Sequence, residues 1–180
     1  VWDLKIKSPE ILAINPPTLG AINDLNNLES VNSNFKDVEY LIISPQHLSS
    51  SVMELAKLRS SSKLLHSYKT GVVEVERVFQ HYSGGRPSPT AIRDFLRYVK
   101  SIAGDEFKYL LLVGDTHYDV RNLLKKGVDL NVPTYEIEDY ATDDFYGLLD
   151  PGEELIRSSY DFDVSLGRLP VSSDEDVENY

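Results

Sequence analysis

The chain has 180 residues, of which 41% are hydrophobic and 26% are charged, a size and composition typical of one ordinary globular domain. Its 18 Lys and Arg residues against 29 Asp and Glu residues give a formal net charge of −11. This charge repels polyanions, so we expect no binding to nucleic acid or anionic membrane, and a Lys- or Arg-bearing partner fits better. The absence of Cys excludes a thiol nucleophile, a thiolate metal site and a disulfide within these residues.

The sequence as given predicts neither a membrane-spanning segment nor a signal peptide. No run of about 18 apolar residues is present, and Val1–Lys5 lacks the basic and then apolar layout of a signal peptide. We therefore expect no membrane insertion by these residues. Because the sequence starts without Met and stops at Tyr180 without a capping or Gly/Pro signal, we expect it to be an excised part of a longer protein.

The pattern of apolar residues changes near residue 36. Residues 1–6 alternate with period two, and an irregular stretch with Pro16–Pro17 and six Asn residues after position 14 follows. We expect residues 1–35 to be the tail of a preceding β-rich domain plus a connector. Residues 36–180 are then expected to form one α/β subdomain.

The first half of this subdomain predicts two strands and two helices. Residues 38–44 are a short apolar run, typical of a strand buried on both faces, and 71–76 read as a second strand. Between them the spacing predicts a helix from about 48 to 65, with Ser49–Ser51 available to cap its start. Another helix is predicted over 90–99, where Ser88 or Thr90 caps it and Pro89 suits the first turn.

The second half predicts two further strands around a long loop. Residues 108–113 are the clearest buried strand, and Gly114–Asp115 turns the chain out at its carboxyl end. Residues 116–160 show little periodicity, and a structureless loop of that length is usually functional. A last strand and turn is predicted over 163–171, and the acidic stretch 172–177 begins a helix.

This order of elements predicts a three-layer α/β fold. Strands that alternate with helices indicate a mostly parallel sheet with helices on both faces, Rossmann-like or flavodoxin-like. Binding groups in such sheets gather at the carboxyl ends of the strands. We therefore expect Ser44, Asp115, the 116–160 loop and Arg168 on one rim.

Common catalytic motifs are absent: the sequence has no G-x-G-x-x-G, no phosphate-binding loop, no H-E-x-x-H and no G-x-S-x-G. Asp115 and His117, with Asp119, could bind a transition metal as in metal-dependent phosphoesterases, but the further His and Asp blocks of such sites are missing. The alternative is a turn in which Asp115 accepts backbone N–H bonds. No His has a paired nucleophile, so we expect surface or packing roles for all four: His47, His66, His81 and His117.

Residues 140–150 combine adjacent carboxylates with aromatic rings. Asp143 and Asp144, beside Tyr140, Phe145 and Tyr146, could make an acidic pocket for a guanidinium or ammonium group. The alternative is structural: Thr142 or Asp143 caps a turn and the rings cover the core.

Six short motifs in order resemble the gingipain family of cysteine peptidases, and most closely the sortases of the type IX secretion pathway. The resemblance covers nearly all of the chain from about Tyr40. The motifs are residues 40–44, 79–85 leading into 90–95, 110–115, 132–135, 142–150 and 163–171.

The resemblance implies that this chain is a non-catalytic half. In the family the catalytic His and Cys lie in a second, caspase-like subdomain, and neither a Cys nor a Gly-His-Gly motif occurs here. In arginine-specific relatives an Asp of the matching loop lies at the base of the substrate pocket, and it aligns with Asp143. Asp144 is the competing choice. The implied substrate-binding residues are Asp143, Asp144 and Tyr146, with the missing subdomain of the same chain as partner.

The resemblance also implies a mechanism and a location. The longer protein would attack a peptide bond with a His-activated thiolate, on an exported protein substrate with Arg or Lys, at the surface, outer membrane or exterior of a Gram-negative bacterium. No cofactor is required; calcium is implied by analogy, with Asp150, Glu153 and Glu154 as a weak ligand pattern. The alternatives left open are an acidic interaction module without catalysis and the phosphoesterase.

Overall fold

The computed structural model describes residues 35–61, 66–116, 132–138, 140–153, 155 and 161–180. All of the predicted substrate-binding residues lie within these ranges. The strand predicted over residues 1–6, nearly all of the connector, His117, Asp119 and Glu154 lie outside them.

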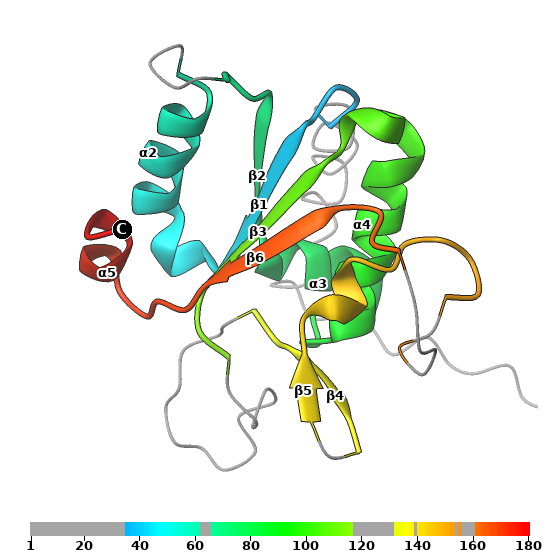
Figure 1. The fold of residues 1–180 in the computed structure, drawn as a ribbon. Coiled ribbons are helices and arrows are strands. Elements are labelled where there is room, and N and C mark those ends of the chain that lie inside the picture. The colour runs from blue at the N-terminus through cyan, green and yellow to red at the C-terminus, as the bar shows by residue number, and fades with distance from the viewer. Residues whose placement is uncertain (1–34, 62–65, 117–131, 139, 154, 156–160) are drawn as a thin grey trace, which may run out of the picture.

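Four parallel strands form the central sheet, in the order β2-β1-β3-β6 (Figure 1). Their bounds are β1 Tyr40–Ser44, β2 Thr70–Glu74, β3 Tyr109–Val113 and β6 Ser165–Leu169. β1 and β3 lie in the middle and are apolar runs because both of their faces are covered. β1 pairs with β2 on one side and with β3 on the other. A crevice at such a reversal of strand order is the usual binding place of open α/β sheets.

Helices cover both faces of the sheet, which confirms the predicted three-layer architecture. α2 (Ser49–Arg59) and α5 (Asp174–Glu178) lie on one side, and α3 (Val75–Ser83) and α4 (Pro89–Ala103) lie on the other (Figure 1). The larger core lies under α3 and α4 and includes Phe79, Phe95 and Tyr146, whereas the smaller one lies under α2 and α5. The described residues also contain three short 3-10 helices: η1 Gln46–Leu48, η2 Gly104–Glu106 and η3 Asp144–Tyr146.

The predicted start of α4 is confirmed. The Ser88 hydroxyl accepts the backbone N–H of Ala91 at 3.4 Å, and Pro89 occupies the first turn. The start of α2 was predicted wrongly, because Leu48 is its N-cap and no side chain caps it. Ser49 and Ser51 instead donate to acidic side chains, namely Glu74 at 3.2 Å and Asp174 at 2.6 Å. α2 also ends at Arg59, earlier than the predicted 65.

One helix and one hairpin of two strands were missed. α3 follows β2 directly, so its first residues read as a continuation of the strand. The hairpin of β4 (Tyr135–Ile137) and β5 (Tyr140–Thr142) lies in the stretch predicted to lack structure. Strands of three residues are too short to show a period of two.

Candidate functional site

Arg168, on β6, joins three segments at the carboxyl end of the sheet. Its Nε and Nη2 donate to the two carboxylate oxygens of Asp143, each at 2.7 Å. Its Nη1 donates to the carbonyl oxygens of Gly114 and Val132, each at 2.9 Å. The Arg168 and Asp143 side chains are only 12% and 18% exposed. A bidentate pair so shielded from water holds both groups in one orientation.

The end of β3 supplies one wall of this arrangement. Gly114 has a φ of +123°, a backbone conformation that residues other than Gly rarely adopt. A Cβ at this position would lie 3.3 Å from Cδ of Pro45. Its N–H donates to the carbonyl of Leu169 at 2.9 Å. The Gly114 carbonyl is thereby held where Arg168 reaches it.

The turn after β5 supplies Asp143. The Thr142 hydroxyl accepts the backbone N–H of Asp144 at 3.1 Å, and the N–H of Tyr146 donates to the Asp143 carbonyl at 2.9 Å. Tyr146 has no exposed surface, and its hydroxyl donates to the carbonyl oxygen of Pro133. Burial, together with the charge of Asp143, raises the pKa of Tyr146 well above its usual range. The buried ring therefore anchors the turn to the core.

The structure brings the three predicted substrate-binding residues into this one turn. Asp143 points to Arg168, Asp144 is half-buried in η3, and Tyr146 lies beneath them. Their contact with a substrate stays a prediction. The structural alternative holds for part of the motif, because Thr142 caps the turn and Phe145 and Tyr146 are core residues. Of the three rings, only that of Tyr140 is exposed.

Arg168 was expected on the rim, but no partner was predicted for it. The available signal was a basic residue inside the last predicted strand, because a shielded guanidinium requires an anion. Ser44, expected on the same rim, is instead fully buried, and its hydroxyl has no hydrogen-bond partner in the described part of the chain.

The Asp115 side chain behaves as the turn alternative predicts. Its Oδ1 accepts the backbone N–H of Thr116 at 2.8 Å. His117, the proposed second metal ligand, lies outside the described residues. Asp115 and Asp176 line a shallow pocket of about 360 Å³ beside the end of β6. The described histidines His47, His66 and His81 are exposed, in line with surface roles.

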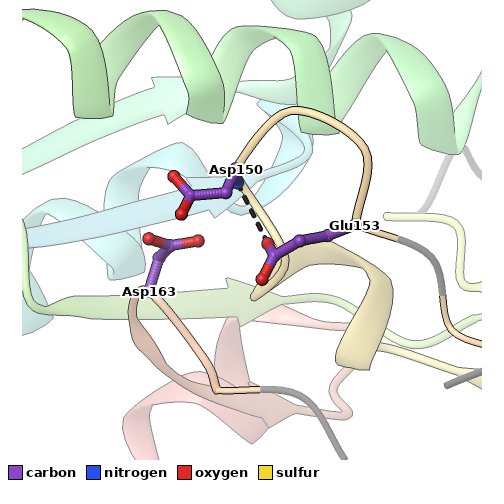
Figure 2. A group of neighbouring side chains, drawn as sticks. All are labelled: Asp150, Glu153 and Asp163. Atoms are coloured by element: carbon purple, nitrogen blue, oxygen red, sulfur yellow. Dashed lines mark hydrogen bonds between the residues drawn. The ribbon is translucent and has the colours of Figure 1, made fainter.

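Asp150, Glu153 and Asp163 form the group of carboxylates in Figure 2, with one oxygen of each within 4.8 Å of the others. Asp163 accepts the N–H of Leu149 at 2.8 Å, and Glu153 accepts the N–H of Asp150 at 3.0 Å. Asp163 joins the predicted Asp150 and Glu153, and the third predicted ligand, Glu154, lies outside the described residues. The three oxygens suit a hard cation such as Ca²⁺. However, the nearby carbonyls of Leu149 and Asp150 already accept from Arg97.

None of the described helices has the length and apolar character needed to cross a membrane. A comparison with curated proteins gave no match. Among solved structures, the chain is similar to dimeric latent PorU from Porphyromonas gingivalis, with a TM-score of 0.64 and 23% identity. It is also similar to the Arg-specific cysteine proteinase gingipain R, with a TM-score of 0.51 and 18% identity.

Both structural matches cover most of this chain but little of the other protein. They cover 79% and 77% of this chain, against 15% of PorU and 26% of gingipain R. At these identities they show a shared fold. The sequence model of Peptidase family C25 matches residues 33–180, more than four fifths of the chain. The predicted resemblance is thereby confirmed, and the chain belongs to peptidase family C25.

Proposed function

We propose that this chain is the N-terminal, non-catalytic half of the peptidase region of a gingipain-like cysteine endopeptidase or sortase. Family membership supports a peptidase that acts on protein. The 180 residues contain no Cys, so the nucleophile comes from another part of the longer protein. The family match begins at residue 33, which supports a subdomain over 36–180 that follows the tail of a β-rich domain and a connector over 1–35. An exported substrate and a surface or extracellular location in a Gram-negative bacterium belong to the same proposal.

The proposed role of this half is to supply the base of a pocket for a basic substrate side chain. The observation that carries it is the Asp143 carboxylate, fixed by Arg168 at the carboxyl end of a parallel sheet. A carboxylate that is already oriented loses little entropy when it binds a ligand. Such an edge is also where open α/β sheets bind their ligands.

The Arg168 contact limits what Asp143 can do alone. Arg168 uses one lone pair on each oxygen of Asp143 and offsets its charge. One further lone-pair position on each oxygen remains for a substrate guanidinium. Because the charge of Asp143 is offset, selectivity for a cation requires a second carboxylate, and Asp144 is adjacent in the turn. We therefore assign the pocket to Asp143 and Asp144 together, with Tyr146 as the support beneath them.

The test uses the longer protein that includes the region supplying Cys and His. Asp143→Asn and Asp144→Asn variants are assayed on matched peptides with Arg, Lys or Ala before the cleaved bond, with and without a thiol-alkylating agent. We expect alkylation to abolish cleavage. We expect each variant to lower kcat/KM for the Arg peptide by about 10²-fold, with little change for the Ala peptide, because a charge-assisted contact is lost only for a cationic side chain.

Other outcomes are equally informative. An equal loss on all three peptides would mean that the variant disturbs the turn and not cation recognition. Cleavage that resists alkylation would contradict a cysteine mechanism. If the longer protein has neither Cys nor Gly-His-Gly, the net charge of −11 favours the second candidate, an acidic module that docks a basic partner.

Calcium is a separate proposal, with Asp150, Glu153 and Asp163 as its ligands. A bound Ca²⁺ would stabilise the loop between Asp150 and Asp163, so we expect millimolar CaCl₂ to raise the melting temperature relative to EDTA. Asp150→Asn is the cleanest variant, because the Asp150 carboxylate makes no hydrogen bond in the described part of the chain. If CaCl₂ raises the melting temperature of Asp150→Asn as much as that of the unaltered chain, Ca²⁺ does not bind at this cluster.

A further inference from the structure

The side chain of Arg93 lies in a column of stacked planar groups beside α4. Its guanidinium carbon lies 3.8 Å from the centre of the Phe145 ring. Phe145 in turn stacks on Tyr135, with 3.8 Å between ring centres and 8° between planes. Cation–π contact with Phe145 restrains the guanidinium in its position over the ring.

Arg93 has no anionic or hydrogen-bonding partner among the described residues, and its Nε is buried without an acceptor. Arg97, one turn later on α4, uses Nε and Nη2 on the carbonyls of Leu149 and Asp150 at 3.0 and 3.2 Å. Burial, and after it the charge of Arg97, lower the pKa of Arg93. A guanidinium stays protonated at neutral pH, and the nearby charge of Asp94 partly offsets the effect of burial and of Arg97. Arg93 is thus a partly desolvated cation without a direct ion pair among the described residues.

The two arginines line a pocket on this face. The pocket has a volume of about 480 Å³, and its lining includes Arg93, Arg97, Tyr135, Phe145, Glu153 and Leu155. Two guanidinium groups and one carboxylate line it, and Arg97 also pairs with Asp94 at 3.9 Å, which leaves Arg93 as the cation without a direct ion pair among the described residues. Its volume is sufficient for an amino-acid side chain.

We propose that this pocket binds a peptide carboxylate, either an Asp or Glu side chain or a chain-end carboxylate, through the Arg93 guanidinium. A carboxylate matches the bidentate geometry of the guanidinium edge, and the stacked rings offer an apolar wall to the rest of the residue. Glu153 in the same pocket repels a doubly charged phosphate more than a singly charged carboxylate. The site thus joins Arg93 of α4 to Phe145 of η3, two residues after Asp143, and would bind a group of opposite charge to the one proposed for Asp143. It does not depend on the pocket proposed for a basic side chain.

Three short peptides distinguish the sources of the carboxylate. The first has one Asp side chain and both ends blocked, the second has only apolar side chains and a free carboxyl end, and the third has Asn in place of Asp with both ends blocked. Binding to the full chain is followed by NMR of the Arg Nε–H groups and by calorimetry. We expect one of the first two peptides to shift the Arg93 signal and to bind at least 10-fold more tightly than the Asn peptide. Binding of neither would overturn the proposal.

Variants test the residue itself. Arg93→Gln is expected to weaken binding of the acidic peptide at least 10-fold, and Arg93→Lys to weaken it less, because Lys keeps the charge but loses the planar fork. Glu153→Gln removes a competing negative charge and is expected to strengthen binding. Arg86→Gln, at an exposed loop position, is the matched control and should leave binding unchanged. If Arg93→Gln does not fold, two other results still test the proposal. They are the shift of the Arg93 signal in the unaltered chain and the change in affinity of the Glu153→Gln variant. Equal binding by Arg93→Gln and Arg86→Gln would refute the assignment.

Discussion

Arg168 and Asp143 are neighbours in space but lie 25 residues apart in the chain. The guanidinium serves the carboxylate and two backbone carbonyls at once, so the two partners are not equivalent. Removal of Asp143 leaves Arg168 with two acceptors. Removal of Arg168 leaves a shielded carboxylate and two carbonyls without their donor. We therefore expect the loss of Arg168 to lower the free energy of unfolding more than the loss of Asp143.

We predict that Arg168→Met lowers the free energy of unfolding by about 3–5 kcal/mol, the usual result of removing one partner of a shielded ion pair. The measurement is urea unfolding followed by circular dichroism. Arg86→Met, at an exposed position, should change stability by less than about 0.5 kcal/mol. The double variant Asp143→Asn with Arg168→Met should be more stable than Arg168→Met alone, since it leaves no unpaired charge. A cost of under about 1 kcal/mol for Arg168→Met would show that water reaches the pair.

At the level of elements, the carboxyl end of β3 and the start of α5 depend on local geometry that can be tested by single substitutions. β3 is followed directly by Gly114, which has a positive φ, whereas a Cβ added at Gly167 within β6 would meet open space. α5 begins with a reciprocal pair of bonds between Ser173 and Asp176. Each feature gives one prediction.

Gly114→Ala is expected to lower the free energy of unfolding by about 1–3 kcal/mol, because its φ of +123° is strained for Ala and the new Cβ meets Pro45. Gly167→Ala is the matched control. A Cβ at Gly167 meets no atom within 4 Å, so this change should be neutral or slightly stabilising in a strand. The measurement is again urea unfolding. Equal effects of the two substitutions would contradict the role assigned to Gly114.

The start of α5 should depend on pH. The Ser173 hydroxyl, followed by backbone N–H donors, holds the pKa of Asp176 below its usual value of 3.8. Because the folded pKa is the lower one, the contribution to stability is complete above about pH 4 and is lost as the pH falls through the folded pKa. We expect the Asp176 carboxyl to titrate by NMR below 3.8, and Ser173→Ala to move this midpoint up toward 3.8. Unchanged midpoints would exclude the capping bond in solution.

For the whole molecule, the net charge of −11 is the property that governs its encounters with other molecules. We predict no binding to a labelled DNA duplex at low salt, measured by fluorescence anisotropy. A labelled oligolysine should bind, with an affinity that falls as NaCl rises from about 50 to 500 mM, because exposed charges are screened. DNA binding at low salt would contradict the exclusion drawn from the charge.

Some elements of the fold could be predicted from the sequence and others could not. Apolar runs predicted β1 and β3, and the spacing over residues 90–99 predicted α4 with its Ser88 cap. α3 was not predicted because it follows β2 without a break. The hairpin of β4 and β5 was not predicted because its strands are too short to show an alternation of apolar and polar residues. The sequence predicted the residues of the candidate site, Asp143, Asp144 and Tyr146. It did not predict which side chains and carbonyl groups they contact.

The sequence by itself determined the α/β class, the acidic charge, the lack of a thiol and the resemblance to its family, because these depend on composition and local pattern. Tertiary structure alone decided that Asp143 pairs with Arg168 and that Asp163 joins Asp150 and Glu153. It also decided that Arg93 stacks on Phe145 without an acceptor for its Nε. Charges far apart in sequence interact only when the path of the chain brings them together, and local periodicity records which face is buried but not which partner lies there.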